Sequence, residues 1–195
     1  MRMLSIKSPR DMSKDVHCRK AVPEDVQAVV ALGKQLELRE GEDPSDACSH
    51  GFLIYVKPGE AYEKRFSLSQ YCSVAELDGE IVGFLIAHDA EELTAMGDLL
   101  KYPQVLKEYL FALEHPHWIY IDQIAVGPKH QKQGIGQSLY DFTFGDTKKS
   151  LLVAGNTLSP IPNEASYQFF SKNGHTLLSE LKEGKWRFGM YGKEV

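Results

Sequence analysis

The residues best placed to do chemistry are Gln131, Gly134 and Gly136, within the stretch "VGPKHQKQGIG". The apolar run "WIYIDQIA" precedes this stretch, and the segment "QSLYDFTF" follows it. A strand that enters a helix through a glycine-rich turn leaves backbone N–H groups unpaired at the helix start, where the helix dipole also favours an anion. Glycines let the backbone approach a phosphate closely because they carry no Cβ. The stretch therefore predicts a phosphate-binding turn.

The spacing of the glycines decides which kind of turn this is. A Walker loop needs G-x-x-x-x-G-K-[ST], which the sequence lacks. A dinucleotide-binding turn needs G-x-G-x-x-G, but Gly134-Ile135-Gly136 is followed by Gln137-Ser138-Leu139, so the third glycine is missing. The pattern that remains is Q-x-x-G-x-G.

A second pattern follows in "NEASYQFFSKNG", with Asn163, Ser166 and Gly174 in register. Together the two stretches resemble the GCN5-related N-acetyltransferase (GNAT) superfamily. Its acyl-CoA loop has the form [RQ]-x-x-G-x-[GA], and a later short helix has the form N-x-x-[AS]-x-x-x-Y-x-x-x-G. The order of the expected elements fits this family from about Val16 to Tyr191.

The resemblance implies a mixed α/β fold, with a mostly antiparallel central sheet flanked by helices, and acetyl-CoA as the cofactor. It places the pyrophosphate on backbone amides from Gln131 to Ser138 and the pantetheine arm along the backbone at Ile124 and Val126. A backbone N–H near Ala125 or Val126 would stabilise the oxyanion. The cofactor-binding residues implied in this way are Ile124, Ala125, Val126, Gln131, Lys132, Gln133, Gly134, Ile135, Gly136, Gln137, Ser138, Asn163, Ser166 and Phe170. Asn163 is also a favourable helix N-cap, and the two roles are compatible.

The sequence departs from the family pattern at the position of the general acid. The family often has a tyrosine four residues before the glycine to protonate the CoA thiolate, and here that position is Phe170. Tyr167, three residues earlier on the same helix, is the candidate acid, and Tyr140 is another option. Water is a further alternative, because a thiolate whose conjugate acid has a pKa of about 8.5 leaves without much help.

Asp122 is the candidate base. An amine acceptor with a pKa of about 10 must lose a proton before it attacks the thioester. Strand alternation predicts Trp118, Tyr120, Asp122, Ile124 and Val126 on one face. A carboxylate among such neighbours would be desolvated, which raises its pKa and makes it a better base. The alternatives are that Asp122 binds the acceptor's ammonium or is satisfied by backbone N–H groups.

The predicted function is acetyl transfer from acetyl-CoA to a primary amine of a small molecule or peptide, by direct attack on the thioester. The alternative is a non-catalytic acyl-CoA-binding domain of the same fold, which Phe170 favours. A net charge of −5 argues against a nucleic-acid partner. No H-E-x-x-H or G-x-S-x-G is present, and the three cysteines are far apart, so neither a metal site nor covalent catalysis is expected.

The elements that must position these residues follow from periodicity. We expect the order β-α-ββ-α-β-α-β-α-ββ, with a hairpin at Asp78-Gly79 and a last strand before the second motif over residues 151–154. We predict a flexible tail over residues 1–15 and one domain over residues 16–195. With no apolar stretch long enough for a signal peptide or a membrane span, a cytoplasmic protein is expected. The acidic, leucine-rich segment 89–115 could cap the acceptor pocket or form a homodimer surface.

Overall fold

The computed structural model describes residues 16–39, 50–97, 103–148 and 150–195. The predicted flexible tail, residues 1–15, lies outside the described residues. Within them, seven strands form one sheet in the order β1-β2-β3-β4-β5-β7-β6. The β4–β5 pair is parallel and every other pair is antiparallel. The expected fold class, a mixed and mostly antiparallel sheet flanked by helices, is therefore confirmed.

The strands and helices follow the predicted order. The strands are β1 (His17–Lys20), β2 (Ser73–Leu77), β3 (Glu80–Asp89), β4 (Trp118–Val126), β5 (Leu151–Ser159), β6 (Thr176–Glu183) and β7 (Trp186–Glu194). The helices are η2 (Pro23–Asp25), α1 (Val26–Lys34), α3 (Gly59–Leu68), α4 (Ala90–Met96), α5 (Gln104–Phe111), η4 (Pro128–His130), α6 (Ile135–Phe144) and α7 (Glu164–Lys172). At the β2–β3 turn both Asp78 and Gly79 have positive φ, as the "DG" pair predicts.

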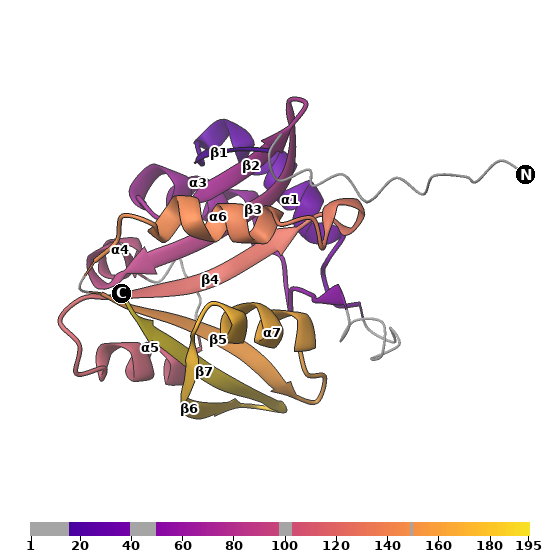
Figure 1. Ribbon diagram of the computed structural model, residues 1–195. Coiled ribbons are helices and arrows are strands. Elements are labelled where there is room, and N and C mark those ends of the chain that lie inside the picture. The colour runs from indigo at the N-terminus through magenta and orange to yellow at the C-terminus, as the bar shows by residue number, and fades with distance from the viewer. Residues whose placement is uncertain (1–15, 40–49, 98–102, 149) are drawn as a thin grey trace, which may run out of the picture.

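The two faces of the sheet carry separate cores. On one face, α6 packs across β2, β3 and β4, and α7 lies over β5 (Figure 1). Phe170 of α7 and Leu139 of α6 are buried in this core with Ile119 and Ile121 of β4. On the other face, α1 and α3 cover Phe84 and Ile86 in one cluster, and α4 and α5 cover Trp118, Tyr120 and Val153 in another. The sheet thus separates a face covered by α6 and α7 from a face covered by α1, α3, α4 and α5.

Strand β5 is longer than the sequence predicts. Residues 155–159 were expected to form a loop, but β5 continues to Ser159. Glycine and asparagine are unfavourable in strands by propensity, yet here Gly155 and Asn156 pair with Met190 and Gly189 of β7. Tertiary pairing overrides local preference, and this extension builds one side of the site described next.

Candidate active site

The site begins where β4 and β5 separate. Residues 118–121 of β4 pair with residues 151–154 of β5, and the two strands then diverge, as Figure 1 shows. Beyond that point β4 pairs with β3 and β5 pairs with β7. Among the described strand pairings, none joins the facing edges over residues 122–126 and 155–159. Buried backbone N–H and C=O groups need partners, so this open edge can accept an extended polyamide as an added strand.

A cavity of about 670 Å³ occupies this opening, which is within the usual range for a small-molecule site. It passes through the sheet, because its lining comes from both faces. On the α6–α7 face it is lined by the residues around the glycine turn and the start of α7, and on the opposite face by Tyr55, Leu106, Tyr120, Asp122, Thr157, Phe188 and Met190. The arrangement allows two molecules to meet from opposite faces of one sheet.

The glycine turn has the geometry of an anion site. Chain reversal between η4 and α6 uses left-handed backbone at Lys132 (φ 60°) and Gly134 (φ 84°), and α6 begins at Ile135. The side chain of Gln131 donates from Nε2 to the carbonyl of Val126 at 3.3 Å, which fixes the turn to the end of β4. The first N–H groups of a helix have no helical carbonyl before them, so they can bind a phosphate. This turn can therefore bind an anion such as a pyrophosphate.

Most of the predicted cofactor residues surround the cavity. Twelve of the fourteen line it: Ile124, Ala125, Val126, Gln131, Lys132, Gly134, Ile135, Gly136, Gln137, Asn163, Ser166 and Phe170. Gln133 and Ser138 do not, and their side chains bond locally to the carbonyls of Lys129 and Gly134. The side chain of Gln137 exchanges hydrogen bonds of 2.9 and 3.1 Å with Asn173, so it ties α6 to α7.

Asn163 is the N-cap of α7, as its residue type predicts. Its Oδ1 accepts from the backbone N–H of Ser166 at 3.2 Å. Its Nδ2 donates to the carbonyl of Phe52 at 3.0 Å, which brings the segment before α3 to the cavity. Asn163 therefore shapes the cavity wall as well as starting the helix.

The tyrosines considered as acids lie away from the cavity. Tyr167 is exposed, its ring stands edge-on to Tyr191 at 5.8 Å, and it is not among the lining residues. Tyr140 is buried, and its hydroxyl lies 2.9 Å from Nε2 of His175. Phe170 is buried too, with ring contacts to Phe169 and His175. None of these positions supports proton transfer into the cavity.

Strand β4 does not alternate as predicted, because a β-bulge interrupts it. Ile86 pairs with Gln123 and Ala87 with Ile121, which leaves Asp122 as an extra residue. The bulge reverses the alternation. Trp118 and Tyr120 join the core under α4 and α5, while Ile124 and Val126 pack against the core under α6. The expectation that these residues share one face with Asp122 was therefore wrong for Ile124 and Val126.

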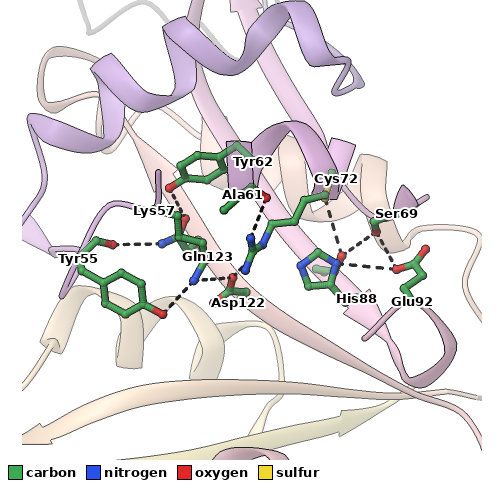
Figure 2. A network of polar contacts seen from close by, with 12 residues as sticks. Tyr55, Lys57, Ala61, Tyr62, Ser69, Cys72, His88, Glu92, Asp122 and Gln123 are labelled. Atoms are coloured by element: carbon green, nitrogen blue, oxygen red, sulfur yellow. Dashed lines mark hydrogen bonds and ion pairs between the residues drawn. The ribbon is translucent and has the colours of Figure 1, made fainter. Parts of the chain in front are cut away.

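Asp122 lies among charges rather than among apolar side chains. Its Oδ2 is 3.3 Å from Nζ of Lys57 and 3.7 Å from Nε of Arg65, and all three side chains are at most 6% exposed. Figure 2 shows this cluster below α3, with the Tyr55 hydroxyl 2.9 Å from Nζ of Lys57. Burial lowers the pKa of Lys57, and the nearby carboxylate of Asp122 opposes this shift. Two cations favour the carboxylate form of Asp122, so the environment predicted for a strong base is not the one observed.

The sequence-based predictions did not include Lys57 or Arg65 as site residues, although the pattern around Arg65 could have indicated it. Arg65 shares the buried face of α3 with Tyr62 and Phe66, at helical spacing. A charged residue on an apolar helix face needs a buried partner, which could have indicated an ion pair. Lys57 precedes the helix in an irregular segment, and no periodicity identifies it.

A second group of polar contacts, around His88 and Glu92, lies beside this cluster (Figure 2). His88 is fully buried, and burial lowers its pKa to about 3, so it is neutral. Glu92 caps α4 together with Asp89 and accepts from Ser69 Oγ at 2.8 Å. In the described ranges no group of three or more His, Cys, Asp or Glu residues is arranged to hold a metal ion. No helix in those ranges has both the length and the apolar character needed to cross a bilayer.

The sequence and the fold were also compared with known proteins. A sequence model of the acetyltransferase (GNAT) family matches residues 40–174. Naa50 of Arabidopsis thaliana, in complex with the bisubstrate analogue CoA-Ac-MVNAL, is 12% identical with a TM-score of 0.60, covering 93% of this chain and 99% of that one. An N-acetyltransferase from Staphylococcus aureus Mu50 is 20% identical with a TM-score of 0.60, covering 91% and 100%. The polyamine N-acetyltransferase of Drosophila melanogaster is 14% identical with a TM-score of 0.60, covering 93% and 100%. No significant match was found among curated proteins.

Proposed function

Because the chain belongs to the acetyltransferase (GNAT) family, we propose that it moves the acetyl group of acetyl-CoA directly to a primary amine of a small molecule or peptide. The chain is thus an N-acetyltransferase that uses acetyl-CoA. The proposal adds that the amine attacks the thioester directly and that it is a primary amine of a small molecule or peptide. The observation that carries it is the cavity that passes through the sheet between β4 and β5. A cavity open to both faces can hold donor and acceptor on opposite sides of one reaction point.

The donor side would be held mainly by backbone groups. The N–H groups at the start of α6, near Gly134 and Gly136, would bind the pyrophosphate. The unpaired edge of β4 at residues 124–126 would pair with the pantetheine arm, and an N–H there would stabilise charge on the thioester oxygen. Asn163 and Ser166 would lie beside the arm. When bound, acetyl-CoA supplies an acetyl group activated as a thioester.

The acceptor side would bring the amine to the same point from the other face. In the transfer an N–C bond forms and the C–S bond breaks, while the nitrogen loses a proton and the thiolate gains one. Asp122 is held as a carboxylate by Lys57 and Arg65, so we assign it to positioning rather than to strong base catalysis. Tyr167 is outside the cavity wall, so we assign protonation of the thiolate to water.

The proposal is tested by measuring free CoA thiol while the protein is supplied with acetyl-CoA and a panel of primary amines. We expect thiol release that depends on the amine, together with an acetylated amine detected by mass spectrometry. A protein that binds acetyl-CoA by calorimetry but releases no thiol with any amine would instead support a non-catalytic acyl-CoA-binding domain. Phe170, which has no proton to donate, is the observation that keeps this second reading open.

A further inference from the structure

The residues on the acceptor side of the cavity limit which amines can enter it. We define the acceptor chamber by six residues on the face covered by α5: Leu106, Tyr120, Asp122, Thr157, Phe188 and Met190. They come from α5, β4, β5 and β7, so their meeting depends on the separation of β4 and β5. We infer that this chamber takes a primary amine carried on one flat apolar body, an arylalkylamine, rather than a polyamine or a peptide. The inference rests on the proposed function.

The walls of the chamber are mainly apolar and partly aromatic. Tyr120, Met190 and Leu106 are each at most 9% exposed, and Phe188 lies beside Thr157 in the register of β7 with β5. Gly155 leaves room between two of these side chains, since an added Cβ would lie 3.4 Å from the Tyr120 hydroxyl and 3.6 Å from Sδ of Met190. Rings and thioethers of this kind favour a planar apolar ligand.

The polar atoms in the chamber are few and buried. Thr157 is 5% exposed, and its Oγ1 has no hydrogen-bond partner. A buried hydroxyl without a partner is costly, so a ligand N–H at this position would satisfy it. One such group suits a ligand with one polar end. A peptide would bring an N–H and a C=O at every residue, and of the six chamber side chains only Tyr120, Asp122 and Thr157 carry polar atoms.

The charges near the chamber argue against a second ammonium. Of the two described carboxylates that line the cavity, Asp122 and Glu183, Asp122 lies 3.3 Å from Lys57 and 3.7 Å from Arg65. Because Lys57 and Arg65 already pair with Asp122, this carboxylate attracts a ligand ammonium less than a lone carboxylate would. An amine at this end would therefore lie there in its neutral form, which has the lone pair needed for attack. A polyamine would place further ammonium groups against the apolar side chains of Leu106, Phe188 and Met190, which is unfavourable.

The experiment compares kcat/KM for 2-phenylethylamine, tryptamine, hexylamine, spermidine and a short peptide with a free N-terminus. We expect the two arylalkylamines to exceed the other three by about tenfold or more, the discrimination expected when a body fills an apolar pocket. A higher kcat/KM for spermidine, the peptide or hexylamine would overturn the inference but leave the proposed function standing. Thiol release with none of the five would overturn both.

A pair of variants tests whether the chamber itself makes the selection. Phe188→Ala should raise the KM for 2-phenylethylamine by about tenfold, which corresponds to one lost aromatic contact, and leave the KM for acetyl-CoA within about twofold. The matched control is Phe142→Ala on α6, where the ring is 51% exposed and does not line the cavity. This control should leave both constants unchanged. An equal effect of the two variants, or a Phe188→Ala effect on acetyl-CoA alone, would contradict the assignment of this chamber to the amine.

Discussion

The sharpest test of the site is the substitution Asp122→Asn, because it separates a structural carboxylate from a catalytic base. The change keeps the shape of the side chain but removes the charge that lies 3.3 Å from Lys57 and 3.7 Å from Arg65. Both cations are at most 3% exposed, so water cannot replace the lost partner. Breaking a buried ion pair from one side costs about 3–5 kcal/mol.

The lower end of this range applies because Lys57 can respond. Its pKa is already lowered by burial, and without Asp122 it falls further, so Lys57 can release its proton at moderate pH. We therefore expect Asp122→Asn to lower the free energy of unfolding by about 3 kcal/mol at pH 7. With a urea dependence of about 2 kcal/mol per molar, the midpoint falls by about 1.5 M. Above neutral pH the unfolded variant then binds more protons than the folded variant. The loss of stability relative to wild type should therefore shrink as the pH rises toward 10.

Urea unfolding can be followed by the fluorescence of Trp118, which is buried, and by circular dichroism. Asp141→Asn on the exposed side of α6 makes the same chemical change without a buried cation, and should shift stability by no more than about 0.5 kcal/mol. Turnover is then measured at low temperature, where the Asp122→Asn protein is folded. If that variant unfolds at the wild-type midpoint and is inactive, the ion-pair reasoning is refuted and Asp122 acts as the base.

Three further predictions concern other parts of the site. Gly134→Asp should weaken acetyl-CoA binding by about a hundredfold or more in calorimetry, because it adds an anion where the pyrophosphate is expected. The control Gly134→Asn, whose side chain is uncharged and tolerates the left-handed backbone (φ 84°), should weaken binding less. Tyr167→Phe should keep kcat within about twofold in the thiol-release assay, because the hydroxyl is outside the cavity wall; a loss of about a hundredfold would restore Tyr167 as the acid. His175 is neutral, and burial lowers its pKa to about 4 from an ordinary value of 6.5, so its contribution to stability is lost as the pH falls through this interval. The free energy of unfolding, measured by urea titration, should fall less between pH 7 and pH 4 for His175→Gln than for wild type, by about 3 kcal/mol at most, and parallel pH dependences would contradict this assignment.

The glycine turn and the α7 cap were predictable because they depend on local sequence. The turn at Gln131, Gly134 and Gly136 and the cap at Asn163 are set by spacing and by backbone conformation within a few residues. The hairpin at Asp78-Gly79 was predictable for the same reason. The predictions of a single domain, a homodimer and a cytoplasmic location stay predictions.

The surroundings of Asp122 were not predictable because they depend on contacts between distant residues. Lys57 and Arg65 meet Asp122 across more than fifty residues of sequence, and the bulge at Asp122 exists only through the register of β4 with β3. Asp122 alone in an apolar strand predicts a desolvated base, while the same residue between two cations is a fixed carboxylate.

The amino-acid sequence by itself determined the glycine turn before α6, the α7 cap and the order of the elements, since short-range geometry encodes them. Only the tertiary structure decided where β4 and β5 part, which residues share the chamber with Phe188, and which charges surround Asp122. The physical reason is that backbone conformation is chosen within a few residues, whereas the electrostatics and shape of a cavity are summed over every element that packs around it.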